Sequence, residues 1–108
     1  MSEMSPGAAL RQLQRAQAGL KKARQTLRNN RPGEDPQAIQ AALRVGWASL
    51  AQCHRLLAEV PVEAATEPVL TKQLAVQRYA TALLVRLRRL VRHEPGALDG
   101  DDDFEAEE

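Results

Sequence analysis

Cysteine and aromatic residues are scarce in this chain of 108 residues, which has one Cys, one Trp, one Tyr and one Phe. A single cysteine excludes an intrachain disulfide and favours a reducing compartment, so we expect the cytoplasm, with the nucleus as the alternative. With so few aromatic rings the core must be built from aliphatic side chains, and a core of Leu and Ala is typical of helices. The length fits a single domain with one modest core.

Long apolar runs and catalytic motifs are also missing. The longest stretch without Asp, Glu, Lys or Arg is Val45 to His54, far short of the ~20 apolar residues that a membrane span needs. Cys53 and His54 are adjacent, but neighbouring helical residues point ~100° apart, so we expect Cys53 in the core and no catalytic pair. The sequence has no Gly-rich phosphate loop and no metal-ligand spacing. We therefore expect a soluble protein that is not an enzyme and has no cofactor, metal, membrane contact or small-molecule substrate.

One part of the chain lacks acidic residues and another part lacks basic residues. Residues 4–33 contain no acid, and residues 94–108 contain eight acids and no base. Residues 1–93 hold all 15 Lys and Arg against six acids, so a body of net charge +9 is followed by a tail of net charge −8. A short segment that is so acidic and so poor in apolar residues cannot bury a core. The charges predict a disordered acidic tail over residues 94–108. We expect a folded domain over residues 6–93, preceded by a disordered N-terminus over residues 1–5.

Three capping residues, each beside or near a proline, mark the helix starts. A capping side chain accepts a hydrogen bond from a backbone N–H of the first turn, and the missing N–H of proline costs nothing there. The three pairs are Ser5 with Pro6, Asp35 with Pro36, and Thr66 with Pro68. The sequence predicts helices over residues 6–29, 36–59 and 67–93, and leaves open whether the third starts near Thr66 or already at Pro61. The expected fold is all-α, an up-down-up three-helix bundle in which an antiparallel helical hairpin receives a longer third helix.

Apolar residues recur every seven positions in the first two segments, and in each segment a row of large side chains runs beside a row that contains small ones. Small residues on facing helices allow a close approach, so we expect a tight antiparallel hairpin in which the two small rows face each other. In the first segment the rows are Leu13, Leu20 and Leu27 beside Ala9, Ala16 and Ala23; in the second they are Leu43, Leu50 and Leu57 beside Ile39, Gly46, Cys53 and Val60.

The third segment is apolar on two faces, of which the hairpin covers only one. The second face is the candidate interface for a partner, and its residues are Leu70, Leu74 and Val85. This pattern predicts a non-enzymatic helical interaction or adaptor module that self-associates or joins a larger assembly as a small subunit. The main stripe of the segment comprises Val69, Val76, Ala80, Leu83, Leu87 and Leu90.

Basic helix faces support a second hypothesis, backbone-directed nucleic-acid binding that the acidic tail modulates. The first segment has no acid that would pair with its bases four positions away. Arg-rich helix faces bind phosphates through salt-sensitive contacts, although a basic solvated face has the same pattern. The candidate contacts to phosphate or to an acidic partner are Arg11, Arg15, Lys22, Arg78, Arg89 and Arg92.

The acidic tail leaves three interpretations open. It solubilises the protein, or it competes with phosphate for the basic faces from an effective concentration of about millimolar. In the third interpretation Phe104, an aromatic residue among carboxylates, is a tail anchor that docks into a basic-rimmed pocket on a partner.

Overall fold

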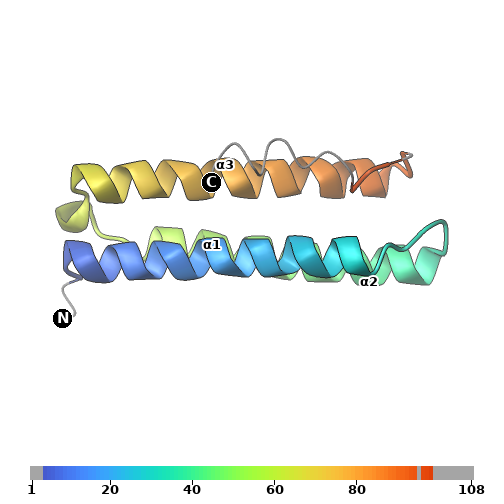
Figure 1. The fold of residues 1–108 in the computed structure, drawn as a ribbon, viewed down its shortest axis with the longest axis horizontal. Coiled ribbons are helices and arrows are strands. Elements are labelled where there is room, and N and C mark those ends of the chain that lie inside the picture. Colours follow the sequence, from blue (N-terminus) through green and yellow to red (C-terminus); the bar gives the residue numbers. More distant parts are fainter. Residues whose placement is uncertain (1–3, 95, 99–108) are drawn as a thin grey trace.

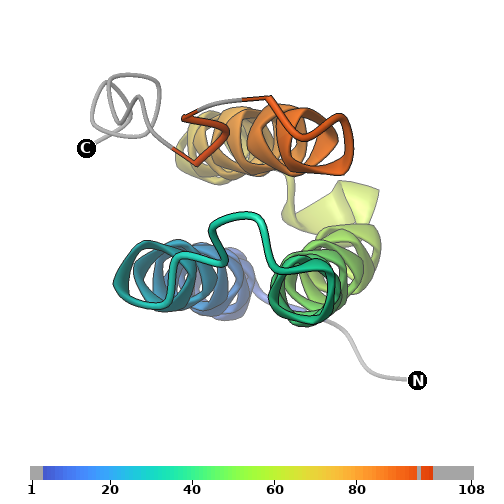
Figure 2. The same cartoon turned by 90° about the vertical axis from the view of Figure 1, so that its right-hand side faces the viewer.

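Three helices and one short 3-10 helix make up the fold in a computed structural model that describes residues 4–94 and 96–98. The elements are α1 (Pro6–Asn29), α2 (Pro36–Ala58), η1 (Val62–Ala64) and α3 (Glu67–Val91). Successive helices run in opposite directions, and α3 packs against both α1 and α2 (Figure 1, Figure 2). The predicted all-α, up-down-up three-helix bundle is confirmed. Disorder was predicted for residues 1–5 and 94–108, of which residues 1–3, 95 and 99–108 lie outside the described part of the chain. Of the described remainder, Ser5 is the N-cap residue of α1, and Ala97 and Leu98 are buried.

The helix bounds agree with the prediction to within two residues, because local capping bonds form at the first two starts. Ser5 Oγ accepts a hydrogen bond from the backbone N–H of Ala8 at 3.1 Å, and Asp35 Oδ1 accepts one from the N–H of Gln37 at 3.1 Å. Each bond satisfies an N–H group that the first turn leaves without an acceptor inside the helix.

The third helix starts at Glu67, which decides between the two starts that the sequence left open. Pro61 precedes η1, a separate 3-10 turn, and Thr66 is the N-cap residue of α3 in an extended conformation (φ −75°, ψ 169°). Pro68 lies in the first turn of α3, where proline removes no helical hydrogen bond. The connection from α2 to α3 is therefore a turn and not an early, kinked part of α3.

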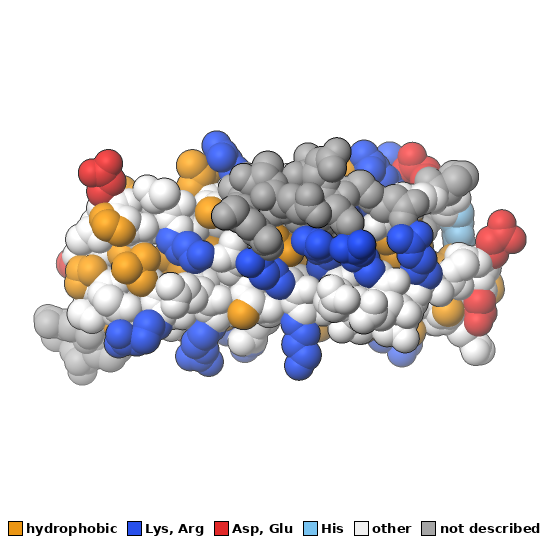
Figure 3. Space-filling view, viewed as in Figure 1, with side chains coloured by type: hydrophobic (Ala, Val, Ile, Leu, Met, Phe, Trp, Pro, Cys, Tyr) orange, Lys and Arg blue, Asp and Glu red, His pale blue; other side chains and the backbone are white. Residues whose placement is uncertain are grey.

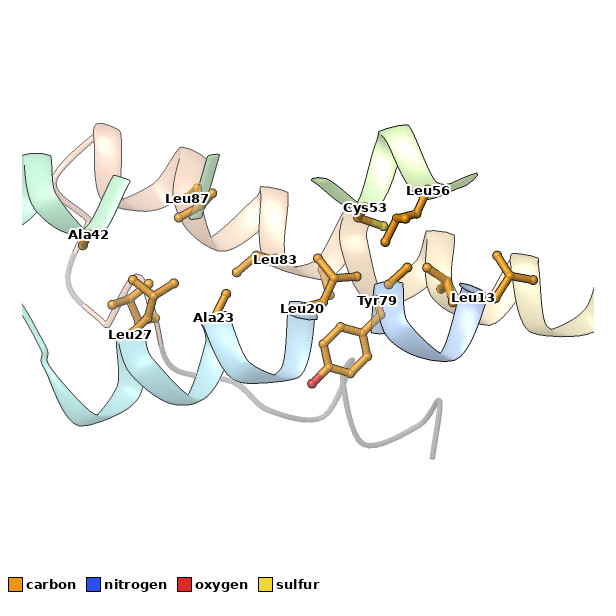
Figure 4. Packing of buried hydrophobic residues seen from close by; sticks show 14 of the residues in the cluster. Leu13, Leu20, Ala23, Leu27, Ala42, Cys53, Leu56, Tyr79, Leu83 and Leu87 are labelled. Atoms are coloured by element: carbon orange, nitrogen blue, oxygen red, sulfur yellow. The ribbon is translucent and has the colours of Figure 1, made fainter. Parts of the chain in front are cut away.

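The core is aliphatic, and side chains from all three helices meet in it (Figure 4). In α3 the predicted stripe is buried except for Ala80, which is half-buried. In α1 both predicted rows are buried: Leu13, Leu20, Leu27, Ala9, Ala16 and Ala23. Because α1 contributes two adjoining rows, it can pack against α2 and α3 at the same time.

Tyr79 is the largest fully buried side chain, a position that the sequence pattern did not assign to it. It lies on α3 at the boundary with α1, and its hydroxyl accepts a hydrogen bond from Arg24 Nη1 at 3.1 Å (Figure 4). A buried phenol group requires such a partner, so this bond joins the core to the surface between α1 and α3.

The packing of α2 departs from the prediction, because the small row of α2 does not face the small row of α1 along its whole length. A Cβ atom added at Gly46 would lie 2.5 Å from both methyl groups of Leu87 on α3. Gly46 therefore accommodates a large side chain of α3, which fills the space above a glycine better than another small residue would. The row of large side chains on α2 is half-buried: Leu43, Leu50 and Leu57.

Polar contacts hold α1 against α2. Gln12 Nε2 donates to the carbonyl oxygen of Leu56 at 3.0 Å and to Glu59 Oε1 at 2.8 Å. Ser49 Oγ donates to the carbonyl oxygen of Gly19 at 3.3 Å. A side chain as short as serine reaches a backbone carbonyl of the facing helix only where the two backbones are close, so the predicted close hairpin is present at Gly19.

The end of α3 is a Schellman turn in which His93 takes the left-handed position that usually belongs to glycine (φ 57°). The N–H of His93 donates to the carbonyl of Leu90 at 3.0 Å, and the N–H of Glu94 donates to that of Arg89 at 3.0 Å. A left-handed residue other than glycine costs roughly 1–2 kcal/mol, so His93 is a strained position.

Gly46→Ala is expected to destabilise the bundle, although alanine is the better helix former. The added methyl group overlaps Leu87, which is fully buried, and overpacking a core costs roughly 1–3 kcal/mol against the ~1 kcal/mol gained in helix propensity. Gly19→Ala is the matched control, because nothing lies within 4 Å of its added Cβ atom. It should stabilise the protein by about 0.5–1 kcal/mol. Urea unfolding measures both free energies, and a stabilising Gly46→Ala would contradict the contact with Leu87.

His93→Gly is expected to raise the free energy of unfolding by about 1 kcal/mol, because glycine adopts the left-handed conformation without strain. Arg92→Gly is the control at the preceding residue, whose φ is −84°. There glycine relieves no strain, adds freedom to the unfolded chain and removes the exposed ion pair of Arg92 with Glu94, so this variant should be less stable than the parent. Thermal unfolding checks both, and a lowered melting temperature for His93→Gly would argue against the strained turn.

Candidate functional site

An apolar groove of about 720 Å³ runs between α2 and α3. Apolar side chains of both helices line it, among them Trp47, Leu50, Leu57, Ala80 and Leu84. Trp47, the single tryptophan of the chain, is 42% exposed at its edge. Leu87 of α3 packs over Gly46 of α2. Because α3 is centred on Gly46, it covers the Leu43, Leu50 and Leu57 row of α2 only in part, and the groove lies along the uncovered side of that row.

The predicted partner interface adjoins this groove. Leu70 and Leu74 are 52% and 48% exposed, and Val85 is half-buried. Leu70 and Leu74 continue a stripe that includes Gln77, Thr81 and Leu84, three residues of the groove wall at the helical spacing of three and four. We call this the outer stripe of α3; its members are Glu67, Leu70, Leu74, Gln77, Thr81, Leu84 and Arg88.

The two ends of the outer stripe carry opposite charges. Glu67 lies in the first turn of α3 and Arg88 in its last turn, and both are exposed. Between them the stripe holds three leucines and two uncharged polar residues. The face is therefore uncharged between its ends, with leucine as its main residue, and it is acidic at one end and basic at the other.

The predicted phosphate contacts lie on two separate outward faces. On α1, Arg11, Arg15 and Lys22 are exposed opposite the buried Leu row. On α3, Arg78, Arg89 and Arg92 are exposed away from its buried stripe. Because each set points away from its own helix contacts, the two sets do not converge on one surface. Arg92 also forms an ion pair with Glu94, with Nη1 and Oε2 3.6 Å apart.

A different set of cations converges where α1 meets α3, and the sequence pattern did not identify it as a cluster. Lys72 Nζ of α3 donates to Gln17 Oε1 of α1, and Arg24 of α1 donates to Tyr79 of α3 as described above. Arg86, only 4% exposed, donates from Nη1 to the carbonyl of Ala82 at 3.1 Å. Figure 3 shows Lys and Arg side chains gathered along this boundary.

The spacing of these residues was the signal that could have revealed the cluster. Lys72, Tyr79 and Arg86 are seven apart on α3, and Gln17 and Arg24 are seven apart on α1. Because α1 and α3 are parallel, the two rows face each other in register. Lys21 and Arg28 flank Arg24 at helical spacing. We call the cluster the basic seam: Lys21, Arg24, Arg28, Lys72 and Arg86.

Cys53 lies in the core, as predicted, and burial raises the pKa of its thiol. A thiol with a raised pKa forms little thiolate and is a poor nucleophile. His54 is exposed on the wall of the apolar groove. Within residues 4–94 and 96–98, no three His, Cys, Asp or Glu side chains come close enough together to hold a metal ion. Phe104, the predicted tail anchor, is outside the described residues.

No helix in the described part of the chain is both long enough and apolar enough to cross a membrane.

Comparisons of the chain with protein-family models, with curated proteins and with solved structures find no match. The function is therefore inferred from the apolar groove, the outer stripe and the basic seam.

Proposed function

We propose that the protein is a non-enzymatic helical interaction module that forms an antiparallel homodimer through the outer stripe of α3 and the apolar groove beside it. The observation that carries the proposal is the continuous stripe from Glu67 to Arg88, in which Leu70 and Leu74 are about half exposed. Scattered apolar side chains are normal on a protein surface, but an apolar row beside a groove is typical of a binding face.

The end charges favour a second copy of the chain as the occupant. In a twofold dimer the same patch is used by both copies, so a helix on the symmetry axis meets its own copy running in the opposite direction. One antiparallel register places Glu67 opposite Arg88, Leu70 opposite Val85, and Leu74 opposite Thr81. This register buries all three predicted interface residues and pairs the opposite charges at both ends.

The expected affinity is modest. Fully burying a Leu or Val side chain contributes ~1.5–3 kcal/mol, and these side chains are already about half buried in the monomer. Two copies of the interface must offset the several kcal/mol that association costs in lost freedom. We therefore expect a dissociation constant between millimolar and micromolar, which corresponds to about −4 to −8 kcal/mol.

A reducing compartment suits this module, because its single cysteine is buried and needs no partner thiol. The cytoplasm, with the nucleus as the alternative, therefore remains the proposed location.

Sedimentation equilibrium should show an 11.9 kDa chain that dimerises with rising concentration, and the emission of Trp47 should shift to the blue as its edge of the groove is covered. Leu74→Glu should weaken the dimer by at least ~10-fold, because it places a carboxylate in the apolar interface. Val62→Glu is the control, since Val62 is 87% exposed in η1 and lies outside the stripe. A chain that stays monomeric at several hundred micromolar would contradict the proposal.

The antiparallel register has its own test. Glu67→Arg should weaken the dimer several-fold, because it places two arginines opposite each other at both ends of the interface. Adding Arg88→Glu should restore the affinity, because it re-forms both ion pairs with the charges exchanged. Exposed ion pairs contribute roughly 0.2–1 kcal/mol each, and the dimer has two of them. Failure of the double variant to recover would exclude this register.

Backbone-directed nucleic-acid binding is a second candidate function, favoured by the exposure of Arg11, Arg15 and Lys22 on a helix that contains no acid. It predicts retention on immobilised DNA that falls steeply with salt and with Arg11→Glu plus Arg15→Glu, which each remove phosphate contacts. Leu74→Glu should leave this retention unchanged. If the charge reversals do not alter retention, the outward face of α1 has no role in such binding.

A further inference from the structure

The basic seam concentrates positive charge on the side of the bundle away from the apolar groove. Lys21, Arg24 and Arg28 of α1 and Lys72 and Arg86 of α3 lie along one boundary, whereas Glu67 is the one acid in the two helices. Such a row of cations creates a positive potential that attracts anions. Because this surface is separate from the outer stripe, binding at the seam does not depend on the proposed dimer.

The described residues that follow α3 lead back toward this seam. After α3 the backbone turns twice at left-handed residues, His93 (φ 57°) and Gly96 (φ 66°). Ala97 and Leu98 are then buried, and Leu98 lines a cavity of about 510 Å³ together with Arg31 and Leu90. In Figure 2 the segment 96–98 has left the end of α3 and comes back toward the side where α1 and α3 meet.

Arg31 places Leu98 at one end of the seam. Arg31 is seven residues beyond Arg24 on the same row that begins with Gln17, although it lies just past the end of α1. Since Arg31 and Leu98 line one cavity, Leu98, the last described residue, lies where the row of cations ends.

We propose that residues 99–108 bind along the basic seam and shield it from other anions. The segment has seven acids and no base, and five cations plus Arg31 lie along its path. Ten extended residues reach ~33 Å, whereas the fourteen positions from Arg86 to Lys72 on α3 span ~21 Å. The segment is therefore long enough to cover the whole seam in the direction from Arg86 to Lys72.

Two physical features favour this occupant over an external one. The anchor at Leu98 keeps the carboxylates at an effective concentration of about millimolar, which an external ligand must exceed. Arg86 is almost completely buried at the edge of the seam, and an anion beside a cation is attracted more strongly in such a less polar environment than in water.

The test uses the full chain and a labelled peptide with the sequence of residues 99–108. In one variant all seven acids of that segment are replaced by their amides, which removes the competing carboxylates without shortening the protein. We expect this variant to bind the peptide in a salt-sensitive manner, measured by fluorescence anisotropy. The parent chain should bind the peptide at least ~10-fold more weakly, because its own segment competes.

Charge reversals locate the binding surface. In the amide variant, Lys21→Glu plus Arg28→Glu should reduce peptide affinity at least ~10-fold, because each replaces an attraction with a repulsion. Arg15→Glu plus Lys22→Glu is the matched control: it also reverses one Lys and one Arg on α1, but on the outward face, and should change the affinity by less than ~2-fold. Circular dichroism confirms that both variants keep their helices.

Three results would overturn the proposal. The first is that the amide variant does not bind the peptide at low salt. The second is equal binding by the parent and the amide variant, and the third is an equal loss of affinity in the seam variant and its outward control. A DNA duplex that binds through Lys21 and Arg28 while the peptide does not would assign the seam to nucleic acid instead.

Discussion

The contact between Leu87 and Gly46 sets how α3 sits on the hairpin, and both candidate surfaces depend on it. Leu87 is fully buried and lies where a Cβ atom of residue 46 would be. This contact brings α3 close to α2 and leaves the Leu50 row at the edge of the interface. Because interiors are closely packed, a shift of α3 away from Gly46 would change the shape of the groove and the register against α1 together.

The two boundaries of α3 have opposite chemistry. Against α2, α3 presents aliphatic side chains whose unburied halves form an apolar face. Against α1, the outer part of the contact consists of polar and cationic groups, with Tyr79 as the link between core and surface. An apolar face is suited to another apolar helix, whereas a basic seam is suited to an extended acidic segment. The two surfaces of α3 on which the proposals depend therefore do not overlap.

Local signals made the helices predictable, and tertiary contacts explain the features that the sequence did not predict. Capping residues with nearby prolines fixed the starts at Pro6, Pro36 and Glu67, because these effects act within one helical turn. A seven-residue repeat shows which residues of α2 form a row but not which helix that row faces. The small row was predicted to face α1, whereas at Gly46 it faces Leu87 of α3. The basic seam required the register between α1 and α3, which no single helix contains, whereas the exposure of Leu70 and Leu74 could be predicted from periodicity alone.

Native-state hydrogen exchange, resolved by residue with NMR, tests most directly whether α3 is docked as firmly as the hairpin. If the contact of Leu87 with Gly46 fixes all three helices, the slowest amides of α1, α2 and α3 should exchange with one free energy, equal to that of global unfolding. The groove and the seam are then permanent surfaces of the native protein. If the amides of α3 instead exchange through a local opening of much lower free energy while α1 and α2 stay protected, α3 is not fixed on the hairpin and the role assigned to the Leu87 contact is contradicted.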